Sequence, residues 1–371
     1  MKRLRLFSKI LILIMSLIIA AQTLVSCGNS RDAVIFASGA FLNKNVQSSF
    51  SYKIYKKPSH YRKAFKDKMS EAYEIMQSYI DDDRTLPIPG IVETYTTGKD
   101  SNSISFGYVP QGLCKAGDFF LITAYDGDKE RNSVIYVVDI AEKKIISTLT
   151  LPNRFHAGGI AFDGERIWVT GATSDKYEGD PFVQYIDYAD FEEMIQHPLC
   201  RVTKKKISPK VYIKNKPSFL ECTNGVLWVG TYVASKNTQR GYMNGYPISS
   251  QNGKVKLDTM MYYVISGIDS SAQGAAIYGN YLYVSSSYMG WTSRIKSSFV
   301  TMYDIDKLFN GKTSINLSGK EVRRIEVPKM NEEIEIDEGI LYINYESAYD
   351  GWPVPVIRTD RIMAVRRNLW R

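Results

Sequence analysis

The stretch VPQGLCKAGDFFLITAY, residues 109–125, reads as a β-strand, a tight turn with a glycine and a second β-strand. Four later stretches repeat this pattern, each with β-branched, aromatic and aliphatic residues on both sides of a glycine turn. They are AGGIAFDGERIWVTGA (157–172), SFLECTNGVLWVGTY (218–232), AQGAAIYGNYLYVSSSY (272–288) and NEEIEIDEGILYINYES (331–347). The chain therefore repeats one β-unit five times.

The spacing of these units indicates blades of a propeller. Their turn glycines are 47, 61, 54 and 60 residues apart, which suits four-stranded blades with loop insertions. Further strands are expected between the units, at 133–139, 144–151, 299–304 and 321–327. The prediction is an all-β fold, a five-bladed β-propeller over residues 104–371. We expect 91–97 to supply the missing outer strand of the fifth blade. An open β-sandwich is the alternative, but it would not explain five similar units.

The first residues carry an export signal. MKRLRLFSK (1–9) is basic, residues 10–21 are apolar, and Leu24-Val25-Ser26-Cys27-Gly28 follows. This motif resembles the bacterial lipobox, which implies that 1–26 is a lipoprotein signal peptide and that Cys27 receives diacylglycerol. We therefore expect an extracytoplasmic protein that is lipid-anchored to the cell membrane. An ordinary signal cleaved near Ser26 and an uncleaved anchor are the alternatives.

The charge pattern argues against a nucleic-acid partner. Without residues 1–26 the chain loses four basic residues and no acidic one, and its formal net charge falls from +8 to +4. The remaining basic runs, at 204–206 and 366–367, are short and are not part of a nucleic-acid-binding motif. We expect a monomer with no nucleic-acid partner and no cofactor.

Between the anchor and the repeats, we expect a tether over 27–58 and a helix with a connecting segment over 59–103. Apolar residues recur at spacings of three and four, which predicts an amphipathic helix over 59–82 that packs on the propeller. Two prolines then prevent the helix from resuming. The apolar positions are Tyr61, Phe65, Met69, Ala72, Met76 and Tyr79, and the prolines are Pro87 and Pro89.

Three cysteines remain besides Cys27, and none has the spacing of a metal site. Cys114 and Cys222 occupy similar apolar positions in two repeats and are expected to be buried thiols. A disulfide between Cys200 and Cys222 is the alternative. The run 126–128, Asp-Gly-Asp, hints at a calcium loop but lacks the other ligands of one. We predict no metal site.

In a propeller, the first strand of each blade lines the central channel, so polar residues that enter these strands meet at one mouth. Six or eight residues before the turn glycines stand Gln111, His156, Gln273, Asn331 and Glu333. The second strands end at Tyr125, Tyr232, Tyr288 and Tyr345-Glu346, which would add an aromatic rim. We expect the first five residues, with Tyr125, Tyr288 and Glu346, to bind a glycan, a peptide or an envelope protein. Scaffolding of the blades by these polar groups is the alternative.

Catalysis would need a proton-transferring group at this mouth. The candidates are His156 as a general base and Glu332 or Glu333 as its partner. Gly158-Gly159 has no phosphate-loop context, and we expect it to allow close approach of backbones near the axis.

The repeats also resemble known families. Tyr108-Val-Pro-Gln-Gly-Leu, His156-Ala-Gly-Gly-Ile-Ala, Ala272-Gln-Gly, Met330-Asn-Glu-Glu and Tyr345-Glu-Ser-Ala together resemble a widespread group of exported bacterial β-propeller proteins without an assigned function. More distantly, Pro110-Gln-Gly-Leu, Asn331-Glu and Thr359-Asp-Arg-Ile resemble the five-bladed glutaminyl cyclotransferases, and quinoprotein-type propellers have similar blades.

The resemblance to cyclotransferases implies an acid/base glutamate at the opening of the second blade. This chain has His156-Ala157-Gly158-Gly159 there, without a carboxylate. Our interpretation is therefore a ligand-binding or interaction module without catalysis. The alternative is a propeller enzyme, cyclotransferase-like or glycan-acting, with its site at the channel mouth.

Overall fold

The computed structural model describes residues 34–36, 47–98, 102–172, 180–234, 240–251, 254–260, 262–287, 297–305, 312–352 and 357–371. All of them lie in one structural unit, Val34–Arg371. The predicted signal peptide, Cys27, most of the tether and Tyr288 fall outside the described residues.

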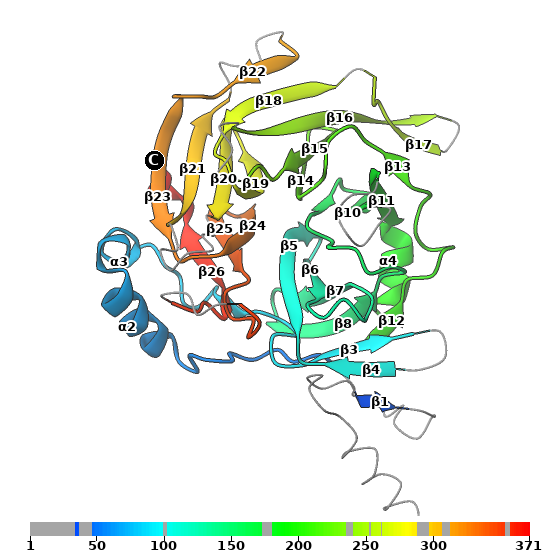
Figure 1. The fold of residues 1–371 in the computed structure, drawn as a ribbon, viewed down its shortest axis with the longest axis horizontal. Coiled ribbons are helices and arrows are strands. Elements are labelled where there is room, and N and C mark those ends of the chain that lie inside the picture. The colour runs from blue at the N-terminus through cyan, green and yellow to red at the C-terminus, as the bar shows by residue number, and fades with distance from the viewer. Residues whose placement is uncertain are drawn as a thin grey trace, which may run out of the picture. The chain divides into compact units, whose positions relative to one another are not determined.

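Five antiparallel sheets surround a common axis, and each is one blade (Figure 1). Blade 1 contains β5 (Tyr108–Ala116), β6 (Phe119–Asp126), β7 (Val134–Asp139) and β8 (Lys144–Thr150). Blade 2 contains β9 (Ile160–Phe162), β10 (Arg166–Ala172), β11 (Pro181–Asp187) and β13 (Val211–Tyr212). Blade 3 contains β14 (Phe219–Thr223), β15 (Val226–Thr231), β16 (Gly241–Gln251) and β18 (Tyr263–Ile268).

Blade 4 contains β19 (Ala272–Tyr278), β20 (Tyr281–Ser287), β21 (Ser298–Asp304) and β23 (Glu321–Val327). Blade 5 contains β24 (Asn331–Asp337), β25 (Ile340–Tyr345), β26 (Arg361–Arg366) and β2 (Leu86–Pro87). The predicted five-bladed β-propeller is confirmed.

The innermost strands close a ring, because β5 contacts β9, β9 contacts β14, and the contacts continue through β19 and β24 back to β5. Each inner strand joins the second strand of its blade through one of the repeated glycine turns. All five turn glycines have positive φ, the conformation that glycine adopts without a Cβ clash. They are Gly117, Gly164, Gly225, Gly279 and Gly339.

The N-terminal segment closes the fifth blade, but the strand is not the one expected. Leu86 pairs with Ile362 and Pro87 with Arg361, so β2 forms the outer edge, where a proline's missing N–H costs no sheet hydrogen bond. The prediction that 91–97 supplies the outer strand of blade 5 is wrong. Its strand β3 (Thr94–Thr97) pairs with the nearby β4 (Asn102–Ser105), which also pairs with β1 (Val34–Phe36). A short hairpin costs less chain entropy to close than a pairing with the distant end of the chain.

Two short insertions connect neighbouring blades. The strand β12 (Leu199–Arg201) arises within blade 2 but pairs in parallel with β8 of blade 1. Likewise, β22 (Ser314–Asn316) arises within blade 4 but pairs in parallel with β18 of blade 3. Another short strand, β17 (Lys254–Leu257), extends β16 of its own blade. The first two insertions therefore add main-chain hydrogen bonds across joints between blades.

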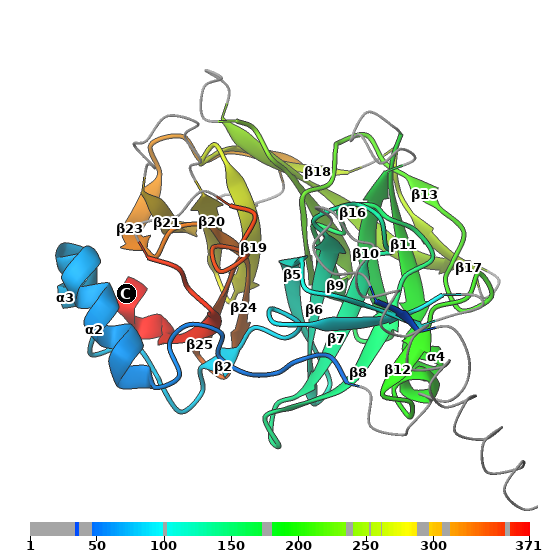
Figure 2. The ribbon, with the colours of Figure 1, turned by 60° about the horizontal axis from the view of Figure 1, so that its bottom comes forward.

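The predicted amphipathic helix is present as two pieces, α2 (Pro58–Lys68) and α3 (Ser70–Met76), separated by Met69 with φ −144° and ψ 58°. Tyr61, Phe65, Ala72 and Met76 are buried in a core shared with blades 1, 4 and 5. Figure 2 shows the pair beside β23 and the C-terminal end. Among the described residues, the other helices are α4 (Tyr188–Met194) and the 3-10 turn η2 (Arg367–Trp370). Within the described ranges, no helix has the length and apolar character needed to span a bilayer.

Candidate functional site

Three inner strands are irregular where they enter the channel. The pairing register shifts between Pro110 and Leu113, between Ala272 and Gly274, and between Asn331 and Ile334. A β-bulge leaves residues out of the ladder and turns their side chains in a new direction. The residues released in this way include Gln111, Gln273, Glu332 and Glu333. Polar side chains of blades 1, 4 and 5 are thereby available at one end of the channel.

A cavity of about 290 Å³ opens at this end. Six residues named from the sequence line it, five of them expected ligand-binding residues and one, Tyr232, expected in the aromatic rim; they are Gln111, Tyr125, His156, Tyr232, Gln273 and Glu346. The other lining residues are Lys216, Pro217, Ser218, Ser287 and Trp352. We call this cavity the mouth pocket.

The remaining mouth-pocket residues differ in how well the sequence repeat marks them. Lys216 and Ser218 precede β14 at the same entry that Gln111 and Gln273 mark in other blades, so the repeat alignment could have found them. Ser287 ends the second strand of blade 4. Trp352 follows β25 in a loop without periodicity, and nothing in the repeat points to it.

One carboxyl group that lines the mouth pocket, that of Glu346, is paired with a second carboxyl, that of Glu332. The side chains of Glu332 and Glu346 are hydrogen-bonded to each other and are 2% and 6% exposed. The Nε2 of Gln273 donates to both carboxyl oxygens of Glu332, at 2.9 and 3.0 Å. The Nε2 of Gln111 donates to the Pro110 carbonyl at 2.8 Å and to Glu346 Oε2 at 3.4 Å. Side-chain amides from two other blades thus position the acidic pair.

Burial and mutual repulsion set the ionisation of this pair. Burial raises the pKa of Glu346 to about 7, and burial together with the neighbouring Glu346 charge raises the pKa of Glu332 well above its usual value. Two carboxyl groups in contact resist double ionisation and titrate as a unit. Near neutral pH the pair therefore keeps a proton in the hydrogen bond between the two carboxyls, and the remaining oxygen lone pairs can accept hydrogen bonds.

His156 is held as a neutral ring. Its imidazole stacks on Tyr125, with ring centroids 4.3 Å apart and planes tilted by 31°. Burial lowers its pKa to about 3, and the positive charges of Lys129 and Lys216 act in the same direction. At neutral pH the imidazole carries no charge and is a weak base.

Three other predicted residues lie away from the mouth pocket. Glu333 is fully buried and accepts hydrogen bonds from the backbone N–H groups of Leu220 (3.3 Å) and Ala275 (3.0 Å), so it links blade 5 to blades 3 and 4. Asn331 donates from Nδ2 to the Phe299 carbonyl at 3.1 Å. Tyr345 is buried in the core instead of forming part of a rim. Tyr288 is outside the described residues.

The opposite end of the channel has a separate polar cavity of about 300 Å³. Cys114, Cys222, Glu221 and Glu335 are among the residues that line it. Burial raises the pKa of both of these carboxyls, that of Glu335 to about 7, and the Glu335 charge contributes to the shift of Glu221. Cys114, Cys200 and Cys222 are free thiols in this structure, so the bridge left open by the sequence is not formed.

The Asp-Gly-Asp run is a structural turn. Asp126 Oδ2 accepts the backbone N–H groups of Glu130 (3.0 Å) and Arg131 (2.9 Å) and pairs with the Arg131 guanidinium at 3.2 Å. In the part of the chain that the structure describes, no three His, Cys, Asp or Glu side chains are grouped closely enough to hold a metal ion.

The fold and the mouth pocket define a five-bladed β-propeller with an acidic, aromatic-lined pocket on its axis. No protein-family model and no curated protein matches the sequence. Among solved structures, the chain is similar to the hydrazine synthase of Kuenenia stuttgartiensis, with 14% identity and a TM-score of 0.34. The match covers 64% of this chain and 56% of that one, so it spans little more than half of the neighbour.

Proposed function

We propose that this chain is an extracytoplasmic β-propeller, anchored to the membrane through Cys27, that binds a sugar residue of a glycan at the mouth pocket without catalysing a reaction. The observation that carries the proposal is the hydrogen-bonded pair Glu332 and Glu346 beneath an aromatic-lined cavity. A sugar ring presents clustered hydroxyl groups that both donate and accept hydrogen bonds. The remaining lone pairs of the carboxyl oxygens and the side-chain oxygens of Gln111 and Gln273 can accept hydrogen bonds from such hydroxyl groups, and the hydroxyls of Ser218 and Ser287 can donate.

The size and walls of the mouth pocket support a small ring. A volume of about 290 Å³ is at the lower limit for small-molecule sites, so one sugar residue suits it better than a long chain. Tyr125, Tyr232 and Trp352 supply flat apolar surface, on which the C–H face of a sugar can pack. Ser218 and Ser287 add hydroxyl groups on the walls.

The geometry of the acidic pair disfavours glycoside hydrolysis. Retaining glycosidases hold their two carboxyl groups about 5 Å apart and inverting enzymes hold them farther apart, because the bond to be cleaved lies between them. Glu332 and Glu346 are in direct hydrogen-bond contact, which leaves no room for that bond. His156, with a pKa of about 3, is poorly matched to general base catalysis near neutral pH.

Binding can be tested by titration calorimetry on the full chain carrying Cys27→Ser, which removes the proposed lipid acceptor. Glucose, galactose and N-acetylglucosamine serve as probes, and dialanine represents a peptide ligand. We expect at least one sugar to bind. Glu346→Gln should weaken that binding about tenfold or more, because a buried charge-assisted hydrogen bond is lost.

Glu335→Gln is the matched control, since Glu335 is also a buried carboxyl with a pKa of about 7 but lies at the opposite end of the channel. It should leave sugar binding unchanged. Binding of dialanine alone would replace the glycan by a peptide. A sugar affinity that responds equally to both variants would place the ligand outside the mouth pocket and contradict the proposal.

A further inference from the structure

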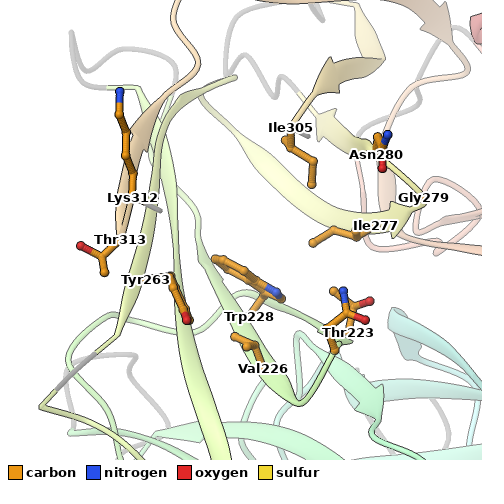
Figure 3. Close-up of a pocket in the computed structure, with 11 residues that line it drawn as sticks. Thr223, Val226, Trp228, Tyr263, Ile277, Gly279, Asn280, Ile305, Lys312 and Thr313 are labelled. Atoms are coloured by element: carbon orange, nitrogen blue, oxygen red, sulfur yellow. The ribbon is translucent and has the colours of Figure 1, made fainter. Parts of the chain in front are cut away.

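A further cavity lies in the joint between blades 3 and 4, away from the channel mouth; it shares Thr223 and Ile277 with the polar cavity at the opposite end of the channel. Its volume is about 550 Å³, within the range of small-molecule sites. It shares no lining residue with the mouth pocket. Figure 3 shows Trp228 of β15 and Ile277 of the β19 hairpin approaching each other from opposite sides, while Lys312 extends along the edge of the cavity away from them. We call it the joint cavity.

Aromatic and aliphatic side chains form the interior of the joint cavity. The rings of Trp228 and Tyr263 lie 6.0 Å apart, centroid to centroid, and are tilted by 37°. Ile277 and Ile305 face them from blade 4 (Figure 3). A flat apolar surface of this kind favours a planar ring, because offset stacking adds to the free energy of burial.

The edge of the joint cavity carries positive charge. Among its lining residues, all of which the structure describes, Lys312 is the single charged side chain, and no Asp or Glu is present. Asn224, Asn280 and Thr313 add polar groups that can bond to a ligand. An anionic group on the ligand would therefore meet a cation and several hydrogen-bonding groups, without an opposing carboxylate.

The fold gives this cavity a defined wall. Lys312 and Thr313 immediately precede β22, the strand that arises in blade 4 and pairs in parallel with β18 of blade 3. Val264, which follows Tyr263 in the sequence, donates its backbone N–H to the Thr313 carbonyl at 2.8 Å. The crossing strand therefore fixes the cationic edge beside the aromatic wall. We propose that the joint cavity is a second binding site, for a planar aromatic molecule that carries an anionic group.

Anilinonaphthalene sulfonate has this chemistry and fluoresces when it leaves water, so it is a suitable probe for the full chain carrying Cys27→Ser. We expect one saturable site, with energy transfer from tryptophan to the probe. Lys312→Gln should weaken binding by about two- to fivefold, the effect of losing one exposed ion pair. Lys320→Gln, which removes another exposed lysine of blade 4, is the matched control and should have no effect. Phenylnaphthylamine, which lacks the sulfonate, should bind equally to the parent and to Lys312→Gln.

Trp228→Phe keeps an aromatic wall but removes the nearest fluorophore, and it should reduce the energy transfer to bound probe. Near-ultraviolet circular dichroism must be native-like in each variant, because this probe also binds partly unfolded proteins. Equal affinities in Lys312→Gln and Lys320→Gln, or unchanged energy transfer in Trp228→Phe, would overturn the proposal. Glu346→Gln should leave probe binding intact, so failure of the mouth-pocket proposal is distinguishable from failure of this one.

Discussion

Replacing Gly159 with alanine tests how tightly the inner strands meet at the axis. An ideal Cβ on Gly159 would lie 2.6 Å from the Leu220 backbone nitrogen and 2.7 Å from Phe219 Cα and the Phe219 carbonyl carbon. All three atoms belong to the backbone of β14 in the next blade, so no side-chain rotation can relieve the contact. The close approach expected for the Gly158-Gly159 pair is therefore present.

We expect Gly159→Ala to lower the free energy of unfolding by about 3 kcal/mol, at the upper end of the cost of overpacking, because two blades must separate. Gly225→Ala is the control. Gly225 has φ +71° and no atom within 4 Å of an added Cβ, so alanine there meets only backbone strain, worth about 1 kcal/mol.

Urea unfolding followed by tryptophan fluorescence measures both variants, provided that their m-values match the parent value. Gly225→Ala carries the strain of a positive φ that Gly159→Ala does not, so the difference between the two variants is a lower bound on the packing cost at Gly159. If Gly159→Ala proves no more destabilising than Gly225→Ala, the blades do not meet as closely as described.

Four further predictions follow from other parts of the chain. Cys27→Ser should abolish incorporation of labelled lipid, and equal labelling of variant and parent would contradict the anchor. Deleting 331–371 removes three strands of blade 5 and should unfold the whole ring, unless near-ultraviolet circular dichroism stays native-like. The raised pKa of Glu346 means that its contribution to stability is fully present below about pH 4.5 and is lost as the pH rises through about 7. The free energy of unfolding measured in urea should therefore be higher at pH 5 than at pH 8. This difference should be smaller in Glu346→Gln. No cyclisation of glutaminyl peptides is expected, and turnover of a glutaminyl dipeptide that His156→Gln abolishes would establish an enzyme instead.

The five hairpins were predictable because their signals are local. Each consists of two strands of β-forming residues around a glycine with positive φ, and both features can be read within about 17 residues. The outer edges were not predictable in the same way. The strands β2, β12 and β22 have two or three residues each, too few to show a period, and each pairs with a partner far away in the sequence or in another blade.

At the mouth pocket, counting residues back from the turn glycines does not select the correct residue in every blade. A fixed count back from the turn glycines selects Gln111 and Gln273 in blades 1 and 4 but Glu333 in blade 5. The bulge between Asn331 and Ile334 shifts the register, so Glu332 pairs with Glu346 while Glu333 accepts backbone hydrogen bonds from blades 3 and 4. A bulge depends on the pairing of two strands, so one strand's sequence does not reveal which of two adjacent glutamates joins the acidic pair.

The same bulge explains how the carboxyl of Glu332 is held in place beside Glu346. Asn331 is bonded to blade 4 through the Phe299 carbonyl, and Glu333 is bonded to the backbones of blades 3 and 4. The Glu332 carbonyl in turn accepts the Ser285 hydroxyl at 2.5 Å. Glu332 is thus fixed on both sides by structural contacts, and under the proposed function this fixed carboxyl would reduce the entropy lost on binding. Substitutions at Glu333 should consequently alter stability first, whereas substitutions at Glu332 should alter binding first.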